Sequence, residues 1–239
     1  MNVSVKTSYI AIDLVIFSVV VLLWGSTFVA VKQCLIDWSV VQVVAGRYVL
    51  GALLLMPLAL RWGGSFAGAE TGAYTGAAAG LASGVAVLPI TGAALAATLL
   101  ATACWGLAAQ HYRRHLAKLN ALHVTALSFQ VMGFVMLCVL TLHADTDSFR
   151  SHAVWLPMLL LLGLAILSVV AVTGYNWLIA RWGAVRASSC TYVVPLVALA
   201  WGFAQAEPQG WHVAGACALI AAAMWAVCQP VQKPAEHVH

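Results

Sequence analysis

The sequence predicts an all-α polytopic membrane protein with about eight transmembrane helices in two inverted repeats, the first of them shortened. Of the 239 residues, 63% are hydrophobic and 8% are charged, and the mean hydropathy is +0.96, so too few polar residues remain to cover a globular core. The apolar residues form runs near the length of about 20 that a bilayer requires. A pattern in the first run returns 81 residues later.

The helices are placed by charge-free apolar runs. The first run follows Lys6 and has no small-residue cleavage site before Trp24, so we expect it to be a retained helix. The second is interrupted only by Arg47, and the 40 uncharged residues 71–110 are too many for one crossing. Turn residues at 89–92 divide them into two helices. The expected helices are 10–31, 40–60, 71–88, 93–112, 121–142, 154–179, 185–204 and 211–228.

The repeat involves residues 22–48, LLWGSTFVAVKQCLIDWSVVQVVAGRY. Each copy predicts a helix that ends on a basic residue, a short turn and a returning helix. Because three helices separate the two starts, the copies face opposite ways, as is typical of secondary transporters. The matching positions are Trp24-Gly25 with Trp105-Gly106, Lys32 with Arg113, and Tyr48 with Phe129.

The distribution of lysine and arginine predicts the orientation, since these residues are retained in cytoplasmic loops. With the N-terminus inside, the outer loops hold only Lys32 and Arg150. We therefore expect an integral protein of the plasma (bacterial inner) membrane with both termini cytoplasmic. The basic residues form no stripe, which argues against nucleic acid as a partner. The expected inner segments hold Lys6, Arg61, Arg113, Arg114, Lys118, Arg181, Arg186 and Lys233.

Polar groups inside apolar runs are the candidates for a substrate site. Arg47 lies about 10 Å below the expected outer boundary, where an arginine is costly unless it faces a cavity or a partner. It could bind a substrate carboxylate or phosphate, or snorkel outward and bond backbone carbonyls. The other substrate-binding candidates are Trp24, Ser26, Thr27, Tyr48, Trp105, Gln110, Ser128, Gln130, Tyr175, Asn176, Thr191 and Tyr192.

Each of these candidates has a structural alternative. The tryptophans suit packing or the membrane interface, and Ser26 and Thr27 can bond carbonyls of their own helix. Pro195 should kink its helix, as a gate or as a simple bend. Four glycines at four-residue spacing form a close-packing face, which could serve the fold or a homodimer. They are Gly72, Gly76, Gly80 and Gly84.

Enzymatic chemistry is not expected. The motifs Gly-x-Ser-x-Gly and His-Glu-x-x-His are absent, and His111 and His115 lie at a helix boundary without a nearby carboxylate. Catalytic residues, metals and cofactors are therefore predicted to be none. Asp13 is the only acid near the start of an expected helix, and no carboxylate lies deep in any of them. Facilitated diffusion or exchange is therefore favoured, with proton coupling through Asp13 or a boundary histidine as the alternative.

Several stretches in this order resemble the EamA-type carriers of the drug/metabolite transporter superfamily. They are LLWGSTFVAVK and AGRYVLGALLLMPLAL in the first half, and TLLATACWGLAAQHYRRHL and YNWLIARWGAVRASSCTYVVPLVALAWGFAQAEPQGWHVAGACALIAAA in the second. The resemblance implies two inverted five-helix halves and transport of small organic solutes (amino acids, metabolites or drugs), by export, through alternating access.

This chain departs from that pattern, because GAAAGLASGVAVL resembles the helix that closes the family's first half yet follows the second helix almost directly. The third and fourth helices of the family are missing. We expect residues 1–90 to form a shortened repeat, 91–230 a complete one and 231–239 a polar cytoplasmic tail. A second copy could complete the shortened half, or the chain could be a non-transporting membrane scaffold or a decayed carrier.

Overall fold

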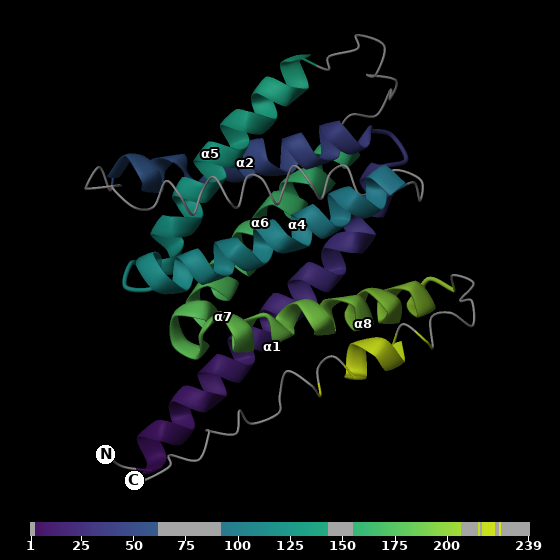
Figure 1. The fold of residues 1–239 in the computed structure, drawn as a ribbon. Coiled ribbons are helices and arrows are strands. Elements are labelled where there is room, and N and C mark those ends of the chain that lie inside the picture. The colour runs from purple at the N-terminus through teal and green to yellow at the C-terminus, as the bar shows by residue number, and fades with distance from the viewer. Residues whose placement is uncertain are drawn as a thin grey trace.

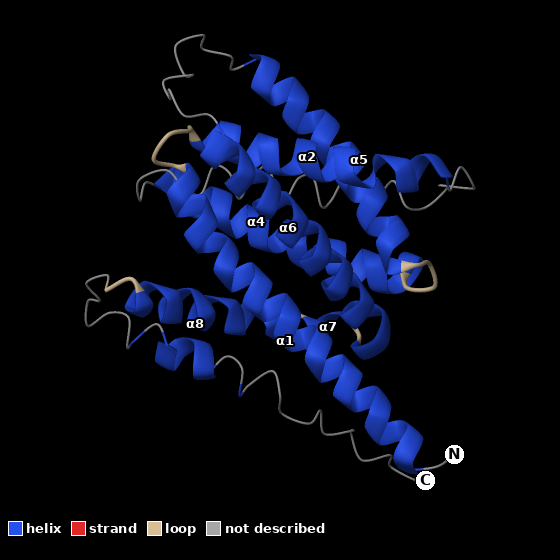
Figure 2. Cartoon of the chain, turned by 180° about the vertical axis from the view of Figure 1, so that it is seen from behind, coloured by secondary structure: helices blue, strands red, loops and turns tan. Residues whose placement is uncertain are grey.

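The computed structural model describes residues 3–61, 92–142, 155–206, 215, 217–222 and 225. All regular structure in these residues is helical, and they contain no strand (Figure 2). Five of the described helices are long and apolar enough to cross a membrane, at Ala11–Cys34, Val40–Arg61, Ala121–Leu142, Trp155–Trp182 and Ala184–Ala204. The chain therefore has the architecture of a polytopic helical membrane protein.

A short turn joins the first two helices, and the N-terminus of the second helix is capped. α1 spans Val3–Cys34 and α2 spans Val40–Arg61. Ser39 and Gln42 form a capping box: the backbone N–H of Ser39 donates to Gln42 Oε1 at 2.8 Å, and that of Gln42 donates to Ser39 Oγ at 3.3 Å. The expected helix 10–31 is thus too short, because a helix can continue past the end of its apolar run. The expected helix 40–60 differs from α2 by one residue.

The next described pair matches the expected bounds closely. α4 spans Gly92–His111 and continues into a π-helical turn, η1, at Tyr112–Leu116; α5 spans Ala121–Leu142. The side chain of Asn120 accepts a hydrogen bond from the backbone N–H of Leu122 at 2.9 Å and caps α5. The helix expected at 71–88, with its four glycines, lies outside the described residues.

The last described helices differ more from expectation. α6 spans Trp155–Trp182 and ends at Gly183, whose φ of +87° favours glycine. One helix was expected at 185–204, but the structure has two, α7 at Ala184–Ala187 and α8 at Ser189–Ala204. The interruption falls at Ser188, and α8 continues through Pro195. Within the expected helix 211–228, the residues that are described are helical.

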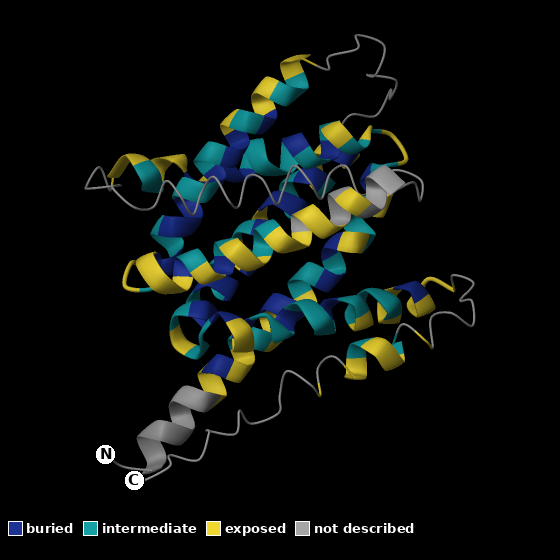
Figure 3. Ribbon diagram, viewed as in Figure 1, coloured by how far each residue is buried: buried dark blue, intermediate teal, exposed yellow. Residues whose placement is uncertain are grey.

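The helices pack against one another, and equivalent helices of the two sequence copies run in opposite directions. α2 packs most extensively against α5, and α1 packs against α6 and α8 (Figure 1). α1 and α4 run in opposite directions, and so do α2 and α5. Buried residues gather where these helices meet, while the outer faces expose large apolar side chains, as lipid contact requires (Figure 3). Among the exposed side chains are Leu14, Val15, Phe28, Leu53 and Phe134.

The ends of the helices are unequally charged. The N-terminus of α1 and the C-terminal ends of α2, α4 and α6 lie toward the same side of the molecule, the left of Figure 1. These ends carry Arg61, Arg113, Arg114 and Arg181, whereas the opposite end of α1 carries Lys32. The described basic residues therefore concentrate on one side of the helix bundle.

Candidate functional site

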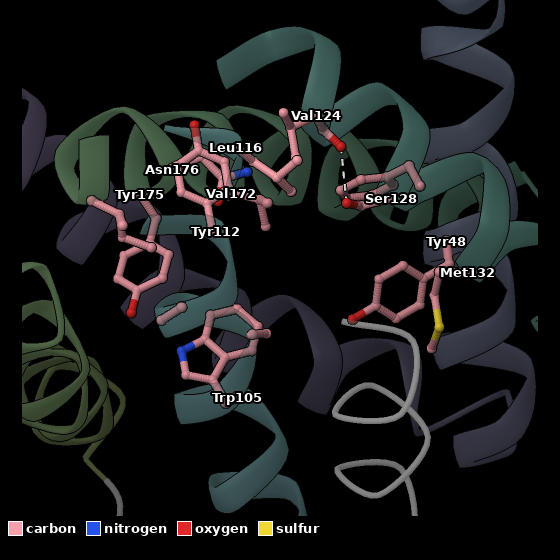
Figure 4. Close-up of a pocket in the computed structure, with 14 residues that line it drawn as sticks. Tyr48, Trp105, Tyr112, Leu116, Val124, Ser128, Met132, Val172, Tyr175 and Asn176 are labelled. Carbon is pink, nitrogen blue, oxygen red and sulfur yellow. Dashed lines mark hydrogen bonds between the residues drawn. The ribbon is translucent and has the colours of Figure 1, made fainter. Parts of the chain in front are cut away.

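A cavity of about 90 Å³ lies between α4, η1, α5 and α6, and Tyr48 of α2 borders it (Figure 4). None of the described residues that line it carries a formal charge. Its volume is well above the roughly 10–15 Å³ that a cavity needs to hold a water. The lining residues are Tyr48, Trp105, Ala108, Ala109, Tyr112, Leu116, Val124, Ser128, Phe129, Met132, Val172, Tyr175, Asn176 and Ile179.

Three aromatic rings from three helices form one wall of the cavity. Trp105 of α4 stacks on Tyr175 of α6, with ring centroids 5.6 Å apart and planes at 26°. Trp24 of α1 packs on both from behind, with centroids 5.8 Å from Trp105 and 5.1 Å from Tyr175. Such arrangements are favoured by the ring quadrupoles. The wall therefore joins the first helix of each sequence repeat.

The opposite side of the cavity is held by Tyr48. Its ring lies 5.6 Å from that of Phe129, and its hydroxyl points into the cavity (Figure 4). Arg47 NH2 donates to the Tyr48 hydroxyl at 3.0 Å, and the guanidinium carbon lies 4.7 Å from the ring centroid. Arg47 is not among the lining residues. NH2 of Arg47 is thus engaged with Tyr48, while its Nε is buried without a hydrogen-bond partner among the described residues. The described lining of the cavity is uncharged.

Several buried polar atoms of the lining have no hydrogen-bond partner among the described residues. They are the indole Nε1 of Trp105 and the hydroxyls of Tyr112 and Tyr175. The hydroxyl of Tyr175 lies near the side chains of Trp105 and Ser188, but outside good hydrogen-bond geometry. Tyr112 and Tyr175 are only 4% and 3% exposed. Buried polar groups are nearly always paired, so unpaired ones beside a cavity mark a place where a ligand or water can bind.

The remaining polar lining residues are engaged in the fold. Ser128 donates to the carbonyl of Val124 at 2.9 Å within α5. Asn176 Nδ2 donates to Thr125 Oγ1 at 3.1 Å, which joins α6 to α5. Thr125 is fully buried and was not expected at the site; a search for every polar residue in the apolar run 121–142 would have found it. Asn176 keeps a carbonyl oxygen for other contacts.

The structure brings together five of the expected site residues, Tyr48, Trp105, Ser128, Tyr175 and Asn176, with Trp24 packed behind them. The others lie elsewhere. Ser26, Thr27 and Thr191 donate to carbonyls of Leu22, Trp24 and Ser188 in their own chain segments. Gln130 donates to the carbonyl of Ala52 at 2.6 Å. Gln110 is exposed, and Tyr192 and Pro195 lie on α8 outside the cavity.

A second polar cluster joins α1 to the end of α6. Asp13 was expected near a helix start, but α1 begins at Val3, so Asp13 lies about three turns inside it and is 7% exposed. Its Oδ1 pairs with Arg181 Nε at 2.8 Å, and its Oδ2 accepts a hydrogen bond from Trp182 Nε1 at 2.8 Å. Phe17 stacks on Trp182 at 5.8 Å. This cluster holds α1 against the end of α6, at the arginine-rich end of the bundle.

The helical architecture defines a polytopic membrane protein, and the aromatic cavity between its helices is a candidate site for a small molecule. The model of the EamA-like transporter family matches residues 90–228, more than half of the chain. The chain belongs to the EamA-like transporter family, which is part of the drug/metabolite transporter superfamily. Neither a curated protein nor a solved structure shows significant similarity to it.

Proposed function

We propose that this chain carries small organic solutes across the membrane by binding them in the aromatic cavity. The observation that supports this best is the cavity itself, which lies where the two sequence copies meet. Tyr48 comes from the first copy, and Trp105 and Phe129 come from the second. Transporters built from inverted repeats bind substrate at such a repeat interface.

Three contacts support a two-fold relation between the copies. Trp24 lies against Trp105 and Tyr48 against Phe129, and a Cβ on Gly133 would lie 2.7 Å from the Cβ of Ala52. The members of each pair are 81 residues apart in the sequence. A residue touches its own equivalent only near an axis that relates the two copies. An alternating-access motion would exchange the roles of the copies about this axis.

The charge distribution supports the orientation. With the arginine-rich end of the bundle in the cytoplasm, the positive-inside rule is satisfied and both termini are cytoplasmic. In a bacterium the membrane would be the inner membrane, and the direction we propose is export. Amino acids, metabolites and drugs all remain candidate substrates at this level.

The alternative is a non-transporting scaffold or a decayed carrier. Among the described residues, Tyr48 is the one lining residue that comes from the expected first repeat, and the others come from the second. A shortened first half could be completed by a second copy of the chain. Without such a copy, it could be too small to close the cavity on the other side.

Transport is tested in proteoliposomes loaded with a pool of labelled amino acids and metabolites. We expect saturable efflux that falls at least tenfold in Trp105→Leu, because this change removes a wall of the cavity. Trp155→Leu is the matched control, since Trp155 is 70% exposed and lies at the far end of α6. Absence of any flux from folded protein would favour the scaffold or the decayed carrier.

A further inference from the structure

We infer that the cavity takes an uncharged, planar aromatic solute that carries a hydrogen-bond acceptor. This inference rests on the proposed function and names the class of substrate. Three features of the cavity support it: the absence of charge in its described lining, the unpaired hydrogen-bond donors and the aromatic residues of the lining.

The charge of the lining argues for a neutral ligand. An ion that enters exchanges its hydration for neutral side chains, which is costly unless a counter-charge is present. The nearest candidate, Arg47, directs NH2 to the hydroxyl of Tyr48 and lies over its ring, and it is not part of the lining.

The unpaired polar atoms argue for an acceptor on the ligand. The indole nitrogen of Trp105 can only donate a hydrogen bond, and the hydroxyls of Tyr112 and Tyr175 can donate as well. The hydroxyl of Tyr48 already accepts a hydrogen bond from Arg47, so its proton is available to a ligand. A carbonyl or ring nitrogen of a solute would satisfy one or more of these donors.

The aromatic lining and the volume argue for a single ring. Five of the fourteen lining residues are aromatic, namely Tyr48, Trp105, Tyr112, Phe129 and Tyr175. Aromatic rings pair favourably in offset-stacked and edge-to-face arrangements, so this lining favours an aromatic ligand. A cavity of about 90 Å³ is small beside the roughly 300–1,000 Å³ of sites for drug-sized ligands, and it suits one ring with a small substituent.

The test is equilibrium binding of radiolabelled benzamide to the full chain in lipid nanodiscs, with empty nanodiscs as background. Benzamide, benzoate and benzamidine have nearly the same shape and differ in charge, and ethylbenzene lacks the acceptor. We expect saturable binding of benzamide, and displacement at least tenfold weaker by each of the other three. Benzoate or benzamidine competing as well as unlabelled benzamide would overturn the assignment, as would the absence of saturable benzamide binding.

Conservative variants test the donors. Trp105→Phe and Tyr175→Phe keep the rings and remove one donor each, so we expect each to weaken benzamide binding about three- to tenfold. Trp155→Phe removes an indole N–H far from the cavity and should leave binding unchanged. Unchanged binding in both cavity variants would overturn the hydrogen-bonding part of the assignment. Failure of benzamide to bind, with flux of pooled solutes retained, would refute this substrate class and leave the proposed transport intact.

Discussion

The indole rings of Trp24 and Trp105 lie with their centroids 5.8 Å apart and their planes at 67°, although 81 residues separate them in the chain. They occupy the same place in the two sequence copies, on α1 and α4. An edge-to-face pair of this kind stabilises by about 0.5–1.5 kcal/mol beyond its area burial. The contact links the two copies directly beside the cavity.

A double-mutant cycle on Trp24→Leu and Trp105→Leu should therefore show coupling. Each single change should lower the free energy of unfolding, and the double variant should lose less than the sum by about 0.5–1.5 kcal/mol. The measurement is unfolding by SDS titration in mixed micelles. Additive losses would mean that the rings do not interact in the folded protein.

The ion pair between Asp13 and Arg181 should stabilise the charged end of the bundle. Asp13→Asn removes the charge of a buried carboxyl that also accepts a hydrogen bond from Trp182, so we expect a loss of about 1–3 kcal/mol in the free energy of unfolding. Asp37→Asn is the matched control, because Asp37 is exposed; it should change stability by less than about 0.5 kcal/mol. Equal effects would show that burial and pairing of Asp13 contribute nothing.

Gly25 and Gly106 are equivalent in the two copies but differ in their surroundings. A Cβ on Gly25 would overlap the side chain of Val197 on α8, whereas a Cβ on Gly106 would have nothing within 4 Å. Gly25→Ala should therefore cost about 1–3 kcal/mol of overpacking, and Gly106→Ala should be neutral or stabilising by up to about 1 kcal/mol.

Thermal unfolding of both glycine variants measures this difference. Val197→Gly should restore part of the stability of Gly25→Ala, because the new Cβ would overlap both the Cβ and the Cγ1 of Val197. Destabilisation by Gly106→Ala that matched that of Gly25→Ala would contradict the close approach of α1 and α8.

The proposed orientation is testable by labelling. Lys118→Cys and Ile36→Cys place single thiols at exposed positions at opposite ends of the bundle, in a chain whose six native cysteines are replaced by alanine. An impermeant maleimide should label Ile36→Cys in intact cells and Lys118→Cys only in inverted vesicles. The reverse pattern would place the arginine-rich end outside.

The bounds of a helix were predictable where a polar capping residue stands at one end of an apolar run. Residues 121–142 were expected and observed as α5, because Asn120 caps its start. The bounds of α1 were not predictable from hydropathy, since the helix continues several residues before its apolar run. The break at Ser188 was not expected either, whereas a kink was expected at Pro195. α8 continues through Pro195, since the carbonyl freed by a proline does not by itself interrupt a helix.

The site was predictable only in part. Tyr48, Trp105, Ser128, Tyr175 and Asn176 stand out as polar or aromatic residues in apolar runs, and they line one cavity. Ser26 and Thr27 stand out in the same way but bond carbonyls of α1, and the sequence offers no signal that separates the two cases. Tyr112 was not among the expected site residues; it lies at the start of the π-helical turn η1 and lines the cavity.

The pairing of Asp13 with Arg181 has a consequence for biosynthesis. The two residues are 168 positions apart, so α1 leaves the ribosome long before α6 exists. At about 5–20 residues per second the delay is roughly ten to thirty seconds. During this time an unpaired carboxylate would cost several kcal/mol in an apolar setting, so it must stay in contact with water. We therefore expect α1 to insert shallowly at first and to reach its final depth only when the ribosome has delivered its partner helix.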